Sequence, residues 1–92
     1  MRAVITGATG DIGSATAEAL GKAGYEVIIT GRRKEELDQT VSRLTDMGIQ
    51  AHGYLCDATN EQSVNDLYAE LAEKFDSLDL LVNNVGGLGG RQ

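Results

Sequence analysis

A glycine-rich loop near the N-terminus constrains this chain more than any other feature. The loop reads Thr6-Gly7-Ala8-Thr9-Gly10-Asp11-Ile12-Gly13. It follows a short apolar run and precedes a helical pattern, and no Lys-Ser or Lys-Thr pair follows the glycines, which excludes a P-loop. Glycines at this spacing suit a tight turn, a close approach of the backbone to a phosphate and close packing of a helix on a strand. The loop therefore predicts a nucleotide site in which N–H groups at the helix start face a phosphate.

Strand-like and helix-like patterns alternate along the chain. Apolar runs predict strands at residues 3–6, 27–30, 50–56 and 79–83. Between them lie three helical stripes: Ile12, Ala15, Thr16, Ala19, Leu20 and Ala23; Leu37, Val41 and Leu44; and Val64, Leu67, Tyr68, Leu71 and Phe75. Gly24 and Gly48 are expected to end the first two helices, and Thr59 with Gln62 has the spacing of a capping box for the third. The order βαβαβαβ predicts an α/β, Rossmann-like parallel sheet with strand order 3-2-1-4.

Length and charge narrow the class of protein. The 92 residues suffice for one domain, and the net charge of −6 argues against a general binder of nucleic acid or anionic membrane. No stretch has the length and apolarity of a membrane-spanning helix. The single cysteine, Cys56, allows no internal disulfide and is expected to be a small buried residue, so the expected compartment is the cytoplasm. His52 has no second ligand nearby, and no metal site is predicted.

Four landmarks together resemble the short-chain dehydrogenase/reductase family over essentially the whole chain. They are the loop from Thr6 to Gly13, the basic pair Arg32-Arg33, Asp57 after the third strand, and the motif Asn83-Asn84-Val85-Gly86 after the fourth. The resemblance implies a cofactor-binding domain over residues 1–92 and these cofactor contacts: Gly7, Ala8, Thr9, Gly10, Ile12 and Gly13 at the pyrophosphate; Asp57 and Ala58 at the adenine; Asn84 and Gly86 at the ribose.

The loop departs from the pattern of the family's classical branch at Gly10, where that branch has a small or basic residue, and at Asp11. The spacing of Gly7, Gly10 and Gly13 is similar to the extended branch, whereas the Asn-Asn-Val-Gly motif is similar to the classical branch, so the branch stays open. Asp11 stands where the classical branch has glycine. Its carboxylate can cap the first helix or repel a pyrophosphate, and we favour the cap.

The residues after the second strand bear on which nicotinamide cofactor fits. NAD-binding units place an Asp or Glu there to hold the ribose 2′-hydroxyl, and in this chain that position falls on Gly31. Arg32 and Arg33 follow, and cationic donors without a carboxylate suit a 2′-phosphate. The alternative is a solvated loop whose basic residues are balanced by Glu35 and Glu36. We favour NADP over NAD.

The family's hydride chemistry needs a tyrosine with a lysine four residues later. None of Tyr25, Tyr54 and Tyr68 has that lysine, so no catalytic residue is assigned and the 92 residues alone are predicted to be inactive. Leu80, Leu81 and Val82 would form an apolar edge strand, so we expect either a fragment of a longer enzyme or a segment that needs a partner surface, and we favour the N-terminal part of a longer enzyme. The resemblance implies a parent oxidoreductase, expected to be a homo-oligomer, that acts on a small carbonyl or alcohol substrate. The alternatives are a non-catalytic nucleotide-binding module and an artificial or truncated half-domain.

Overall fold

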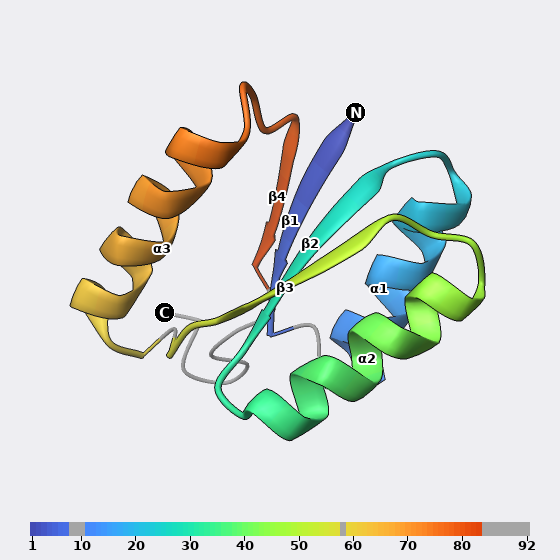
Figure 1. The fold of residues 1–92 in the computed structure, drawn as a ribbon, viewed down its shortest axis with the longest axis horizontal. Coiled ribbons are helices and arrows are strands. Elements are labelled where there is room, and N and C mark those ends of the chain that lie inside the picture. Colours follow the sequence, from blue (N-terminus) through green and yellow to red (C-terminus); the bar gives the residue numbers. More distant parts are fainter. Residues whose placement is uncertain (8–10, 58, 84–92) are drawn as a thin grey trace.

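The computed structural model describes residues 1–7, 11–57 and 59–83, apart from the side chains of Asp11, Ile12 and Asn83. Four strands alternate with three helices in the order β1 Arg2–Thr6, α1 Asp11–Lys22, β2 Glu26–Gly31, α2 Lys34–Asp46, β3 Ala51–Leu55, α3 Glu61–Lys74 and β4 Leu80–Asn83 (Figure 1). The predicted βαβαβαβ order is confirmed, and each strand boundary lies within one residue of its predicted position.

The strands form one parallel sheet in the order β3-β2-β1-β4, as predicted. In register, Val4 of β1 lies opposite Ile28 of β2 and Leu81 of β4. From β1, helix α1 leads to β2 and helix α2 leads to β3, both on one side of β1. Helix α3 then returns the chain to the other side, where β4 pairs with β1. The fold is therefore Rossmann-like, and the direction of winding reverses at β1.

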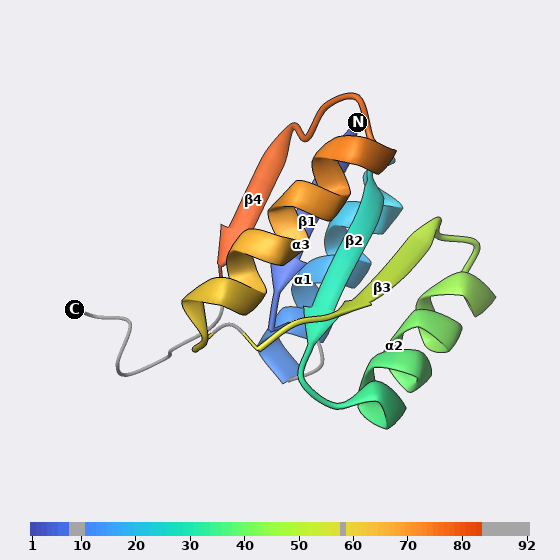
Figure 2. The same ribbon diagram turned by 60° about the vertical axis from the view of Figure 1, so that its left-hand side comes forward.

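The helices divide unequally between the two faces of the sheet. Helices α1 and α2 cover one face and α3 alone covers the other (Figures 1 and 2). The interface between the sheet and helices α1 and α2 buries Ala3, Ile5, Ala17, Val27, Ile29, Leu37, Leu44 and Ile49. The interface between the sheet and helix α3 buries Val4, Ile28, Cys56, Leu67 and Leu71. Successive residues of β1 and β2 thus enter opposite cores, which explains why these strands are apolar without alternation. Burial of Cys56 is as expected.

The predicted buried stripe of α1 is only partly correct. Ala15, Ala19 and Ala23 are exposed, whereas Ala17 is fully buried. Alanines occupy both faces of this helix, so their spacing does not identify the inner one. Gly21 identifies the inner face of α1 better, because a Cβ at that position would lie 2.5 Å from Cγ2 of Ile49.

The N-terminus of α3 also differs from its prediction. Asn60 is the N-cap, and its Oδ1 accepts hydrogen bonds from the backbone N–H groups of Gln62 (2.9 Å) and Ser63 (3.2 Å). Thr59 instead donates its hydroxyl to Asp57. The predicted capping box was therefore one residue out of register, since asparagine caps a helix as well as threonine does. Gly24 and Gly48, with φ of +103° and +85°, follow α1 and α2 as predicted.

Apolar side chains are exposed along β4, as expected for an edge strand. Leu80 is 37% and Leu81 55% exposed, and Leu78 just before the strand is 39% exposed. Within the described residues β4 pairs only with β1. Of the helices described, none combines the length and apolarity needed to cross a membrane.

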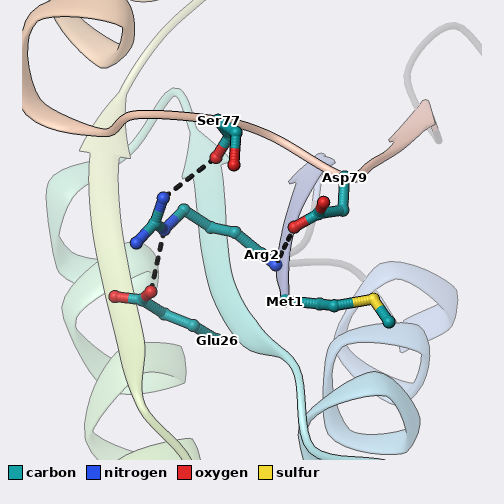
Figure 3. A pocket seen from close by; sticks show the side chains of 5 residues that line it. All are labelled: Met1, Arg2, Glu26, Ser77 and Asp79. Atoms are coloured by element: carbon teal, nitrogen blue, oxygen red, sulfur yellow. Dashed lines mark hydrogen bonds and ion pairs between the residues drawn. The ribbon is translucent and has the colours of Figure 1, made fainter.

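A polar cluster joins the strands at the amino end of the sheet (Figure 3). Arg2 donates through Nε to Glu26 Oε1 (2.8 Å), through its guanidinium to the carbonyl oxygen of Ser77 (2.9 Å), and through its backbone N–H to Asp79 Oδ2 (2.8 Å). His52 Nε2 lies 2.6 Å from Glu26 Oε2. We call Arg2, Glu26, His52, Ser77 and Asp79 the Arg2 cluster; it connects β1, β2 and β3 to the segment before β4.

Candidate functional site

The candidate site lies at the carboxyl edge of the sheet, opposite the Arg2 cluster. Because all four strands are parallel, the residues that follow them meet at this edge: Gly7 after β1, Arg32 after β2 and Asp57 after β3. Helix α1 begins at the same edge, next to the reversal of winding at β1. Open α/β sheets bind ligands at such a reversal, outside the carboxyl ends of the strands.

Two glycines of the predicted loop are described, and both have a structural reason to be glycine. Gly7 has φ of +68°, in the left-handed region that side chains disfavour, and it turns the chain out of β1. Gly13 is buried in the first turn of α1, on the same face of the helix as Ala17. Predicted contacts at Ala8, Thr9 and Gly10, and at the side chain of Ile12, lie outside the described residues.

The strand end after β2 carries no acidic residue. Gly31 is buried and lies opposite Leu55 of β3, and the exposed residues Arg32 and Arg33 follow it. Arg33 is the N-cap residue of α2, and its guanidinium lies 3.3 Å from Glu36 Oε2. Within the described part of the chain, Arg32 makes no hydrogen bond or ion pair. The two arginines therefore differ: Glu36 balances Arg33, whereas Arg32 remains available for an anion.

Asp57 follows β3 and is fixed by local hydrogen bonds. Its Oδ1 accepts from the backbone N–H (3.0 Å) and the hydroxyl (2.6 Å) of Thr59, and its own N–H donates to Ser63 Oγ (3.0 Å). The hydroxyl and then the N–H of Thr59 lower the pKa of Asp57, and the charge of Arg32 acts in the same direction against partial burial. Asp57 is therefore a rigid carboxylate beside Arg32.

Sequence reasoning missed two local partners of Asp57: Thr59, which donates to the carboxylate, and Ser63, whose Oγ accepts from the Asp57 backbone N–H. The signal was present in the spacing, because an Asp whose side chain bonds the residue two positions later forms a common local turn. The predicted contacts at Ala58, Asn84 and Gly86 lie outside the described residues. The residues that the structure describes contain no cluster of three or more His, Cys, Asp or Glu side chains suited to a metal ion.

Comparison with known proteins agrees with this geometry. The family model described as short chain dehydrogenase matches residues 1–92. A putative ketoacyl reductase of Streptomyces coelicolor is 39% identical over 88 residues, which is 96% of this chain and 34% of that protein. A serine 3-dehydrogenase of Rhizobium radiobacter is 42% identical over 83 residues, which is 90% of this chain and 32% of that protein.

Solved structures show the same relationship. A variant of actinorhodin polyketide ketoreductase, solved with NADPH, superposes with a TM-score of 0.85 at 37% identity, covering 90% of this chain and 32% of that one. A metagenomic short-chain oxidoreductase in complex with NADP superposes with a TM-score of 0.83 at 28% identity, covering 88% of this chain and 37% of that one. The chain spans about a third of the length of these relatives. Matched along its whole length by the family model, the chain belongs to the short-chain dehydrogenase family.

Proposed function

We propose that residues 1–92 form the NADP(H)-binding domain of a longer oxidoreductase that transfers hydride between nicotinamide and a carbonyl or alcohol carbon. One observation carries the choice of cofactor. The strand end after β2 presents the buried Gly31, which has no side chain, followed by the exposed Arg32, which makes no hydrogen bond or close ion pair with the described residues. The NADPH and NADP bound to the two structural relatives support the same choice.

The physical argument depends on the charge at the ribose 2′ position. A carboxylate at position 31 would accept a hydrogen bond from a 2′-hydroxyl and repel a 2′-phosphate. Gly31 removes that repulsion, and Arg32 supplies a planar, permanently charged donor that suits phosphate geometry. Because Arg33 is already paired with Glu36, Arg32 is proposed as the stronger phosphate contact of the two.

The remaining contacts are proposed on the same edge of the sheet. Gly7 and Gly13, with Ala8, Thr9, Gly10 and Ile12 between them, would surround the pyrophosphate at the N-terminus of α1. Asp57 and Ala58 would face the adenine, and Asn84 and Gly86 would line the ribose. Hydride transfer would use groups outside this chain, since no Tyr-x-x-x-Lys occurs in it, and the chain alone should bind cofactor without turnover.

A binding titration tests the proposal. The ligands are NADPH and NADH, with adenosine 2′,5′-bisphosphate and adenosine 5′-monophosphate as a matched pair that needs only the adenosine half of the site. In the double variant Arg32→Asp/Arg33→Ala, affinity for the 2′-phosphorylated ligands should fall at least about tenfold, because each lost charged hydrogen bond costs about 1.5 to 3 kcal/mol. Affinity for the other two ligands should change much less.

The control variant changes the net charge by the same amount as the arginine variant, but at sites far from the carboxyl edge. Lys22 and Lys74 lie in the last turns of α1 and α3, so Lys22→Asp/Lys74→Ala makes the protein equally more negative. This control should leave all four affinities nearly unchanged. Equal losses of NADPH and NADH affinity in the arginine variant would contradict the assignment of NADP.

A further inference from the structure

The ends of β2 and β3 are joined by a backbone hydrogen bond beside the candidate site. The N–H of Cys56 donates to the carbonyl oxygen of Gly31 at 2.9 Å, just beyond the last register pair, Gly31 with Leu55. Arg32 and Asp57 are the residues that directly follow the two partners of this bond. The backbone thus brings one cation and one carboxylate together at the point where a ribose 2′ substituent is proposed to bind.

Asp57 is fixed in place, but its carboxylate is only half used. Both hydrogen bonds from Thr59 end on Oδ1, and the backbone N–H of Asp57 is held by Ser63. Within the described part of the chain, Oδ2 makes no hydrogen bond. One oxygen of a locally held carboxylate therefore has no hydrogen-bond donor among the described residues.

The neighbours of Arg32 form ion pairs on their own helix, whereas Arg32 makes no hydrogen bond or close ion pair with the described residues. Arg33 pairs with Glu36 at 3.3 Å, and Lys34 pairs with Asp38 at 2.8 Å. The hydroxyl and N–H of Thr59 lower the pKa of the Asp57 carboxyl group most, and the charge of Arg32 lowers it further. Any anion that enters the site must share Arg32 with Asp57.

Resting on the proposed NADP(H) binding, we propose that Asp57 determines cofactor specificity through Arg32. Its fixed carboxylate competes with the 2′-phosphate for the guanidinium and so reduces the preference for NADPH over NADH. A 2′-hydroxyl carries no charge and does not enter this competition. Any contact of Asp57 with the adenine is common to both cofactors and cancels in the ratio of their affinities. Asp57 thus acts on cofactor preference through the charge of Arg32, in addition to any direct contact with the cofactor.

Four variants test the competition: Asp57→Asn, Arg32→Gln, the double variant, and Asp38→Asn as the control. Asn keeps the size of Asp57 and an acceptor for Thr59. The control removes one carboxylate from the Lys34 pair on the neighbouring helix. Dissociation constants are measured for NADPH and NADH, and for adenosine 2′,5′-bisphosphate and adenosine 5′-monophosphate.

Asp57→Asn should raise the preference for the 2′-phosphorylated ligand by about two- to fivefold, the size expected for one partly exposed charge pair. In the Arg32→Gln background the same substitution should leave the preference nearly unchanged, and so should Asp38→Asn. An unchanged or reduced preference in Asp57→Asn, or an equal change in both backgrounds, would overturn the proposal.

A second measurement needs no ligand. Carbon NMR titration of the Asp57 carboxyl group should give a higher pKa in Arg32→Gln than in the wild type, because the cation that favours the ionised form is gone. An unchanged pKa would refute the link between Arg32 and Asp57, even where NADPH binds tightly. Absence of dinucleotide binding by the wild type, with the pKa link intact, would instead overturn the proposed function and with it the assignment of specificity.

Discussion

Replacement of Glu26 by Gln offers a direct test of how the amino end of the sheet is held together. Glu26 accepts from Arg2 at 2.8 Å and lies 2.6 Å from His52, so one carboxylate joins β1, β2 and β3. Figure 3 shows the same Arg2 side chain reaching the carbonyl of Ser77. The Glu26→Gln variant keeps the shape of the side chain but removes its charge.

The size of the effect follows from burial. The side chains of Arg2 and Glu26 are 26% and 21% exposed, which places the pair between a surface salt bridge and a buried one. Hydrogen bonds to charged groups contribute about 1.5 to 3 kcal/mol, surface pairs about 0.2 to 1, and Gln retains an acceptor, so we expect a loss of about 1 to 2 kcal/mol in the free energy of unfolding. In a domain of this size, each kcal/mol corresponds to about 4 to 8 °C in Tm.

The loss should depend on pH in a defined direction. The hydrogen bond from Arg2 lowers the pKa of Glu26, burial opposes this, and His52 lowers it further. A carboxylate whose pKa is lowered by folding stabilises the protein above its pKa in the unfolded chain. That stabilisation is lost as the pH falls through the lower pKa of the folded state. The difference between wild type and Glu26→Gln should therefore be full at neutral pH and close progressively in acid.

Thermal and urea unfolding followed by circular dichroism across this pH range provides the assay. The matched control is Glu36→Gln, which breaks the more exposed pair with Arg33 at 3.3 Å and should cost less than about 0.5 kcal/mol. A loss in Glu26→Gln no greater than in the control, or a difference that does not change with pH, would refute the role assigned to the Arg2 cluster.

Substitutions at four further positions test the fold by unfolding measurements. Asn60→Ala should destabilise the protein by about 1 kcal/mol through loss of the α3 cap, whereas Asn60→Asp should preserve stability. Gly53→Ala should cost about 1 to 3 kcal/mol, because the added Cβ would lie 2.8 Å from Cγ2 of Val41; a neutral result would show that α2 moves freely over β3. Leu71→Ala should cost about 2 to 5 kcal/mol because the side chain is fully buried, whereas Leu81→Ala, at a position 55% exposed, should change stability by less than about 1 kcal/mol.

Much of the fold could be predicted because its signals are local. Apolar runs bounded by glycine define strands wherever both faces are covered, and right-handed crossovers then leave few possible topologies. The buried face of α1 could not be read in the same way, because Ala15, Ala17 and Ala19 look alike in a pattern and only packing against β1 and β2 distinguishes Ala17. The cap of α3 was ambiguous for a similar reason, since adjacent Thr59 and Asn60 both have capping side chains.

The sequence names candidate residues for the site but does not reveal how they pair. The absence of an acid at position 31 and the presence of Arg32 are evident in the sequence, whereas the difference between Arg32 and Arg33 depends on which one meets Glu36. No local sequence pattern predicts the Arg2 cluster. Its members are brought together by contacts between residues 24 to 77 positions apart, which only the register of the sheet determines.

The two ends of the sheet use charge in opposite ways. At the amino end, Arg2 is bonded to Glu26 and to the carbonyl oxygen of Ser77, so its donors are committed to the fold. At the carboxyl end, Arg32 is unpaired among the described residues, and Asp57 is held through one oxygen only. A cation that makes no hydrogen bond to the protein adds little to stability and can pair with a bound anion. Stability and binding should therefore separate: substitutions in the Arg2 cluster change Tm, whereas substitutions at Arg32 change affinity.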